Sequence, residues 1–312
     1  MTVRLTVHAD AWNAHVERTA RSLPGLVPVV KGNGYGFGRG PLSAIAAELS
    51  GTIAVGTIHE LDHVPAGITA VVLTPTRRPP ADLSAVLTVG SLDHLHALSG
   101  WPGRVVVKLM SSVRRFGATR DEVGMLAAAV RRAGLDIAGF AVHPPVAGSD
   151  DEHLDDISPW LDLLDPADEV WVSHLSAPAY RGLRDAWPER RFRIRAGTAL
   201  WHGDKSALHL GTDVLDVRSV RAGEHAGYRQ ELVPADGTLV MIGAGTAHGV
   251  HPLDDGRSPF HFARRRLSLL ELPHMHTSMA FVPDDQPAPK AGDIVDLQRP
   301  LIDTTVDEVR WR

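Results

Sequence analysis

"VPVVKGNGYGFGRG", residues 27–40, joins a short apolar segment to Lys31 and then places five glycines within nine residues. Glycine lets the backbone approach a ligand closely, because no side chain intervenes. Apolar surroundings lower the pKa of a lysine, and a neutral lysine amine can form a Schiff base with a carbonyl compound. The stretch therefore predicts a buried strand that delivers a reactive lysine to a ligand site.

The apolar segment before Lys31 is one of eight that recur through the first two thirds of the chain. Each is nearly continuous in hydrophobic residues, a pattern typical of parallel strands covered on both faces. The segments are 27–31, 52–56, 70–74, 86–90, 105–109, 137–142, 169–173 and 192–197. Helical patterns lie between several of them, at 40–50, 91–99, 119–134 and 177–187. This alternation predicts an α/β fold, a small (β/α)8 barrel of the TIM type.

Two connections in this region are informative. Thr119 is expected to cap the clearest helix, because acidic residues follow it and Gly134 ends the pattern. The connection over 75–85, "PTRRPPADLSA", is too rich in proline for a full helix, so the barrel is expected to be irregular there.

The pattern changes after about residue 210. Segments such as "GTLVMIGAG" and "DIVDLQ" alternate apolar and polar residues between turns, which predicts an all-β domain. "TVRLTV" near the N-terminus alternates too and is expected to pair with that domain, before a helix over 8–23. We therefore expect a barrel domain over 8–210, followed by a C-terminal β domain over 211–312 that includes an N-terminal strand at 1–7.

Composition narrows the class of protein. The 312 residues carry a formal net charge of -5 and no basic stripe, so we expect no nucleic-acid partner. No apolar run reaches membrane-spanning length and the N-terminus has no signal-peptide pattern, so we expect no membrane partner and a cytoplasmic location. The chain has no cysteine, which excludes disulfides, thiolate nucleophiles and cysteine-bound zinc.

In a barrel of this kind, function lies at the C-terminal ends of the strands. Five of the eight expected strands end in polar or ionisable groups, namely Lys31, Lys108, His143, residues 173–176 and Arg195. Gly197 and Thr198 follow the last strand, and their backbone N–H groups are suited to holding a phosphate. A phosphorylated carbonyl cofactor would use both the lysine and this corner.

Several of these stretches resemble alanine racemases, a family of fold-type III enzymes that use pyridoxal 5'-phosphate (PLP). The first motif, "VVKGNGYGFG", resembles the family's PLP-lysine motif and is specific. Weaker matches follow in the same order as in the family, at "VVVKLMSSVRRFG", "GFAVHPP", "RIRAGTALWHG", "SVRAGEHAGY", "HMHTSMAFV" and "AGDIVDL". The resemblance covers nearly the whole chain and implies a barrel followed by a β domain, working as a homodimer.

The resemblance also implies a role for each matching residue. Lys31 would hold PLP as a Schiff base and act as one catalytic base. Lys108 matches a lysine that is carbamylated in many family members. Arg115 matches an arginine beside the cofactor's phenolic oxygen. The other matches are Tyr35, Ser176, Gly197 and Thr198 at the phosphate, His143 beside the pyridine ring and Arg195 facing the pyridine nitrogen. A guanidinium disfavours protonation of that nitrogen, which suits removal and return of a proton at Cα.

The chain departs from the family at the second catalytic base. Family members use a tyrosine from the partner subunit, but Thr246 stands at the matching position in "IGAGTAHGVHP". His248 and His276 replace two family aspartates, and Asp307 falls near the position of a phosphate-binding tyrosine. An imidazole exchanges protons readily near neutral pH, so one of these histidines is expected to be the second base. The alternative is that both are ordinary loop histidines.

"HMH" at 274–276 offers a further interpretation as a metal site, because alternate residues of a strand share a face. No carboxylate is clearly paired with these histidines, so we expect no metal.

The expected protein is a PLP-dependent amino-acid racemase or epimerase that removes the Cα proton of a small amino acid. A single-base enzyme of the same fold type, a decarboxylase or lyase, is the alternative, as is a non-catalytic PLP-binding protein.

Overall fold

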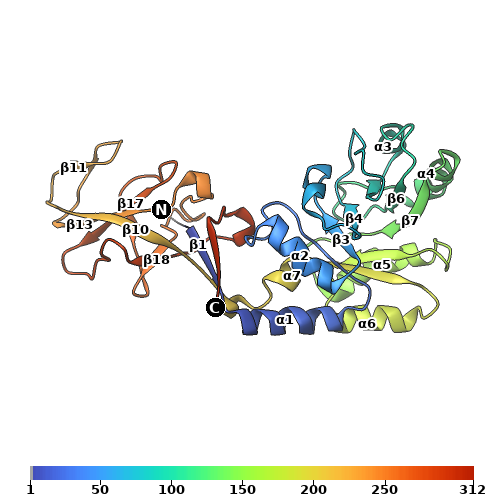
Figure 1. Cartoon of the computed structure of the whole chain (residues 1–312), viewed down its shortest axis with the longest axis horizontal. Coiled ribbons are helices and arrows are strands. Elements are labelled where there is room, and N and C mark those ends of the chain that lie inside the picture. The colour runs from blue at the N-terminus through green and yellow to red at the C-terminus, as the bar shows by residue number, and fades with distance from the viewer. Residues whose placement is uncertain (1–2) are drawn as a thin grey trace. The chain divides into compact units, whose positions relative to one another are not determined.

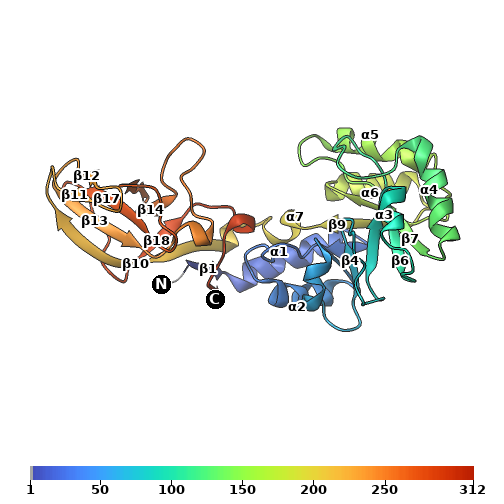
Figure 2. The same ribbon diagram turned by 90° about the horizontal axis from the view of Figure 1, so that it is seen from above.

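The computed structural model describes residues 3–312; Met1 and Thr2, which belong to the strand expected over 1–7, lie outside the described residues. The chain forms two compact units (Figures 1 and 2). One unit holds residues 14–34 and 39–203. The other holds residues 3–13, the short segment Tyr35–Gly38 and residues 204–312.

The first unit is a barrel of eight parallel strands. They are β2 Leu26–Pro28, β3 Thr52–Val55, β4 Thr69–Val72, β5 Val86–Val89, β6 Arg104–Lys108, β7 Asp136–Ala141, β8 Val170–Ser173 and β9 Phe192–Ala196. The sheet runs in the order β2-β9-β8-β7-β6-β5-β4-β3. A parallel bridge between Val29 and Ala54 links its two ends, so the sheet is nearly closed. The predicted (β/α)8 barrel is confirmed, and all eight apolar segments form its strands.

Helices flank these strands (Figure 1). They are α1 Ala9–Ser22, α2 Arg39–Leu49, α3 Leu92–His96, α4 Arg120–Arg132, α5 Asp150–Leu161, α6 Ala177–Ala186 and α7 Thr198–Trp201, with a 3-10 turn η1 Ile58–His63. The Thr119 N–H donates to the Glu122 carboxylate at 2.9 Å, which caps α4 as its sequence predicts. The segment 75–85 forms no helix, as its prolines indicate.

Two helices differ from expectation. The helix expected over 91–99 is shorter, Leu92–His96, and Ser91 caps it by accepting the His94 N–H. Helix α5 carries Pro159 in its C-terminal half, and sequence reasoning did not predict it. Its N-terminus is nevertheless well specified, because Ser149 and Glu152 form a capping box.

The second unit is built around a long strand, β10 Leu208–Val220. The sheet order is β15-β14-β18-β10-β13-β17-β16, and β1 Val3–Val7 pairs antiparallel with β10 and parallel with β19 Glu308–Trp311. The other strands are β13 Gly237–Ile242, β14 Phe260–Phe262, β15 Arg265–Arg266, β16 Ser268–Leu269, β17 Ser278–Pro283 and β18 Ile294–Leu297; β11 His225–Ala226 pairs with β12 Glu231–Leu232. The predicted all-β architecture after the barrel is confirmed, and β1 joins it.

An aromatic cluster explains why Tyr35–Gly38 belongs to the second unit. The Phe37 ring lies 5.2 Å from that of Trp12 and 6.1 Å from that of Trp311, measured between centroids, and the two tryptophans are 5.2 Å apart. Phe37 and Trp12 are buried, and such aromatic pairs contribute about 1 kcal/mol each beyond the area they bury. The glycine-rich stretch that carries Lys31 therefore also carries an aromatic anchor.

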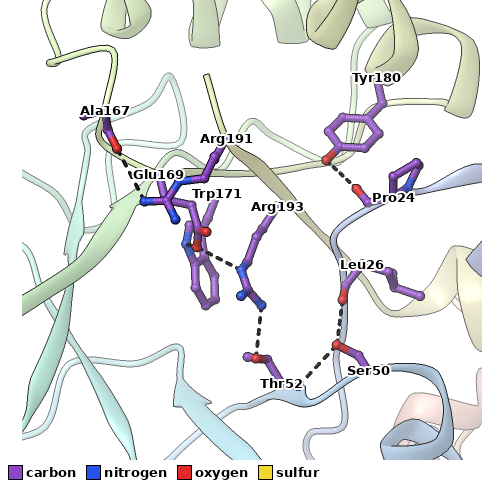
Figure 3. Close-up of polar contacts among 10 residues, drawn as sticks. All are labelled: Pro24, Leu26, Ser50, Thr52, Ala167, Glu169, Trp171, Tyr180, Arg191 and Arg193. Atoms are coloured by element: carbon purple, nitrogen blue, oxygen red, sulfur yellow. Dashed lines mark hydrogen bonds and ion pairs between the residues drawn. The ribbon is translucent and has the colours of Figure 1, made fainter. Parts of the chain in front are cut away.

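At the N-terminal ends of the strands, a polar network crosses the barrel interior (Figure 3). Arg193 donates from Nε to Glu169 Oε1 at 2.8 Å and from a terminal nitrogen to Thr52 Oγ1 at 3.0 Å. The Trp171 indole N–H donates to the same Glu169 oxygen at 2.8 Å, and the Arg193 guanidinium lies 5.3 Å from the centre of the Trp171 ring. These contacts join three strand starts opposite the functional face, where they serve stability.

Replacing Arg193 by methionine is expected to lower the free energy of unfolding by about 2 kcal/mol, because two charge-assisted hydrogen bonds are lost and the Glu169 carboxylate loses its cationic partner, keeping only the Trp171 N–H. Arg191→Met is the matched control. Arg191 is exposed and makes one long hydrogen bond to the Ala167 carbonyl, so its replacement should change stability by less than about 0.5 kcal/mol. Urea unfolding of the two variants measures the difference; equal losses would show that the network does not hold the barrel base.

Candidate active site

Basic side chains gather at the C-terminal ends of the barrel strands. Lys31 follows β2, Lys108 ends β6, Arg195 lies on β9, His143 follows β7, and Arg115 lies in the loop after β6. Charge effects connect them, because Arg115 and Arg195 both act on Lys31, on Lys108 and on His143. The barrel thus brings together five of the residues that the sequence pointed to.

Lys108 and Arg195 are the two buried members of this group. Within residues 3–312 the Lys108 Nζ atom has no hydrogen-bond partner. Burial lowers the pKa of Lys108 well below the ordinary lysine value, and the guanidinium groups of Arg195 and Arg115 lower it further. A buried amine without a partner is costly, so the site is suited to an acceptor group at this nitrogen.

Arg195 points across the barrel toward β7. A terminal nitrogen donates to the Val142 carbonyl at 2.6 Å, while its buried Nε atom has no partner among the described residues. Burial lowers the pKa of Arg195 to about 10, so the guanidinium stays charged at neutral pH. Arg195 thus offers a second buried donor at this face.

The Lys31 amine has a lowered pKa. Burial is the largest cause, the charges of Arg115 and Arg195 add to it, and the Glu60 carboxylate opposes them. Glu60 is buried in η1 and was not among the residues that the sequence singled out. The apolar strand and the basic neighbours together favour the neutral amine that Schiff-base chemistry requires.

His143 stays neutral at physiological pH. Burial lowers its pKa to about 2, with further contributions from Arg195, Lys108, His174 and Arg115. Its Nδ1 atom lies 2.5 Å from Ser173 Oγ, and its ring centroid lies 4.6 Å from that of His174. A neutral ring fixed in this way is suited to packing beside a flat ligand and does not exchange protons near neutrality.

The residues assigned to a phosphate lie after β8 and β9. Ser176 caps α6, and its N–H and Oγ donate to the two oxygens of Asp150 at 2.9 and 2.5 Å. These hydrogen bonds lower the pKa of Asp150. Gly197 and the exposed Thr198 begin the short turn of α7, directly after β9. Tyr35 belongs to the other unit, where its side chain is buried and its φ is +55°.

The two candidate second bases are neighbours in the β domain, with ring centroids 6.2 Å apart. His248 is buried, and both of its nitrogens are engaged: the Gly245 N–H donates to Nδ1 at 3.2 Å, and Nε2 lies 3.4 Å from Asp307 Oδ2. Asp307 also accepts the Val3 N–H at 2.8 Å. His276 is exposed, and Thr246 is exposed close by in sequence to His248.

The structure corrects the interpretation of "HMH" at 274–276. These residues lie in a bend before β17, so the strand alternation assumed for a metal site is absent. His274 instead pairs with Glu271 at 2.6 Å, and the Glu271 carboxylate also accepts the N–H groups of Tyr228 and Arg229. Among residues 3–312, no group of three or more histidine, aspartate or glutamate side chains is arranged to hold a metal ion.

A nearly closed barrel of eight parallel strands, followed by an antiparallel β domain, is the architecture of alanine racemases. The alanine racemase of Bartonella henselae, solved with covalently bound pyridoxal phosphate, superposes with a TM-score of 0.76 at 18% identity over 100% of both chains. The alanine racemase of Bacillus anthracis with bound L-Ala-P superposes with a TM-score of 0.76 at 19% identity, over 95% of this chain and 85% of that one. The alanine racemase of Streptomyces lavendulae superposes with a TM-score of 0.75 at 18% identity, over 100% of this chain and 97% of that one.

The chain belongs to the family described as alanine racemase, N-terminal domain, whose profile matches residues 7–204. This range contains every barrel strand and Lys31. The comparison with curated proteins returned no match. Within the described residues, no helix combines the length and apolar character needed to span a bilayer.

Proposed function

We propose that the protein is a PLP-dependent amino-acid racemase or epimerase. The observation that carries the proposal is the basic face of the barrel, where a lysine amine of lowered pKa lies near Arg115 and Arg195, which also act on Lys108. Within the described chain, Glu60 is the only carboxylate among the groups that shift the Lys31 pKa. Such a site suits an anionic carbonyl compound, and PLP combines an aldehyde with a phosphate and a phenolate.

The unpartnered buried atoms support the fit of this cofactor. Arg195 Nε and Lys108 Nζ are buried donors without partners in residues 3–312, and a polar ligand or a modified lysine would satisfy them. Lys31 would hold the cofactor covalently, with Arg115 and His143 beside its ring. Ser176, Gly197, Thr198 and Tyr35 are proposed at the phosphate. When bound, PLP withdraws electrons from Cα and makes the Cα proton of an amino acid more acidic.

Lys31 and His276 are proposed to exchange the proton at opposite faces of Cα. A base needs an available lone pair, and the Gly245 N–H occupies Nδ1 of His248 while its Nε2 faces Asp307. His276 is exposed and therefore the better candidate, with His248 packed beside it. Because the family resemblance places the second base on the partner subunit, we propose that His276 serves the Lys31 site of a second copy in a homodimer.

Site mapping tests the cofactor assignment. The chain has four lysines, Lys31, Lys108, Lys205 and Lys290, so reduction of the PLP-treated protein with borohydride followed by peptide mass analysis locates the cofactor without ambiguity. We expect the added phosphopyridoxyl mass on the Lys31 peptide, at about one per chain. Labelling confined to the exposed Lys205 and Lys290 would contradict the proposal.

A single-base enzyme, such as a decarboxylase or lyase of the same fold type, is the second candidate. The observation that favours it is Thr246, which stands where the family has its second-base tyrosine; a threonine hydroxyl is too weakly acidic for that role. Retained configuration during Cα hydrogen exchange would select this candidate over a racemase.

A further inference from the structure

Glu60 connects two turns at the functional face of the barrel. Its Oε1 atom accepts the Gly32 N–H at 3.2 Å, and its Oε2 atom accepts the Gly56 N–H at 2.6 Å. Gly32 follows Lys31, and Gly56 follows the last residue of β3. A single buried carboxylate therefore bridges the backbone beside Lys31 to the end of the neighbouring strand.

The space beside Gly56 is bounded by this carboxylate and by the Lys31 side chain. A Cβ atom built on Gly56 would lie 3.0 and 3.2 Å from the two Glu60 oxygens and 3.3 Å from Lys31 Cβ. A side chain at residue 56 would therefore meet both the Glu60 carboxylate and the base of the Lys31 side chain. The backbone after Lys31 is held on its other side as well, because Arg39 donates to the Gly32 carbonyl at 3.0 Å.

The charges around Lys31 act on its protonation in opposite directions. Lys31 is surrounded by the cations of Arg115, from the loop after β6, and Arg195, on β9, and both disfavour its ammonium form. Glu60, from η1, acts in the opposite direction. A lysine that acts as a base has to hold the proton that it removes from the substrate. A negative charge nearby stabilises the ammonium form in which the lysine holds that proton.

We propose that Glu60 is a positioning residue for Lys31: its carboxylate fixes the turn that carries the lysine and keeps a negative charge near that side chain. This role rests on the proposed use of Lys31 as a catalytic base. It is nevertheless a property of the cofactor-free chain, because every contact that carries it lies within the protein. Failure of cofactor binding would therefore leave the test below readable.

Glu60→Gln is the informative variant, because glutamine keeps the size of the side chain and removes its charge. The readout is the rate of trace acetylation of each lysine in cofactor-free protein across a range of pH, measured by peptide mass analysis. Loss of the negative charge disfavours the ammonium, so a larger share of Lys31 is neutral and reactive at a given pH. At neutral pH we expect Lys31 to react about tenfold faster than in the wild type.

Lys205 and Lys290 are internal controls in the same digest, since both are exposed, and their rates should not change. A Lys31 rate profile identical to that of the wild type would overturn the proposal. Should Glu60→Gln not fold, the wild-type protein supplies a second test: the amide resonances of Gly32 and Gly56 should titrate with the same midpoint as Lys31 acetylation. Amides that do not follow that midpoint would overturn the proposal equally.

Discussion

Replacing Lys31 with alanine is expected to abolish covalent cofactor attachment and to lower racemisation by about 10⁴-fold or more. Two contributions are lost together, the nucleophilic amine and one of the two bases, and general acid–base catalysis alone contributes about 10²–10⁴-fold. The variant should fold normally, because the Lys31 side chain is only partly enclosed, so alanine leaves no closed cavity, and the residue lies beyond the last residue of β2. Racemisation of amino acids with saturating PLP measures the effect.

Lys205→Ala is the matched control for this experiment. Lys205 is an exposed lysine in a 3-10 turn of the β domain, so its replacement removes one lysine and leaves the basic side chains of the barrel in place. Its cofactor content and turnover should equal those of the wild type. Turnover in Lys31→Ala within tenfold of the wild type would exclude Lys31 as both cofactor anchor and base.

Replacing His276 with alanine is expected to lower racemisation by about 10²–10³-fold and to make hydrogen exchange one-sided. One enantiomer would still lose and regain its Cα proton through Lys31, while inversion would slow by this factor. Cofactor content should stay at the wild-type level, because Lys31 is unchanged. Chiral chromatography combined with mass analysis in D₂O separates inversion from exchange.

His248→Ala provides the contrast, because His248 is buried and held by Gly245 and Asp307. Its loss removes packing and hydrogen bonds, so the midpoint of thermal unfolding should fall. If His248→Ala instead gives the one-sided exchange and His276→Ala does not, the two roles are reversed. If both variants racemise at the wild-type rate, neither histidine is the second base.

The barrel could be predicted because each strand carries its own signal. Segments such as 105–109 and 192–197 are apolar throughout, and Thr119 marks the start of α4 by a capping pattern that needs no tertiary information. Helix α5 was not predicted, because Pro159 lies in its C-terminal half and proline is disfavoured inside helices. The prediction failed there because a proline in the sequence does not reveal that the surrounding fold tolerates it.

The clustering of basic side chains at one face of the barrel could be predicted because parallel strands of a barrel deliver their ends to one face. Lys31, Lys108 and Arg195 are distant in sequence, and the topology alone brings them together. Glu60 could not be predicted, because its role depends on a turn whose backbone N–H groups point at its carboxylate. Sequence patterns report burial and periodicity but not such directions.

The two histidines show the same limit. Residue type alone made His248 and His276 equivalent candidates, and only the structure distinguishes them. The distinction depends on the Gly245 N–H and on Asp307, which lies 59 positions after His248 in the chain. Likewise, the segment Tyr35–Gly38 begins four residues after Lys31, yet it belongs to the second unit, where Phe37 packs with Trp12 and Trp311.

The central claim, a lysine base acting at Cα of a PLP-bound amino acid, is tested most directly by a screen of amino acids in D₂O with the PLP-loaded protein. We predict that at least one amino acid acquires deuterium at Cα in both enantiomers, and that Lys31→Ala shows neither exchange nor inversion. A loaded protein that exchanges the Cα hydrogen of no amino acid would contradict the account.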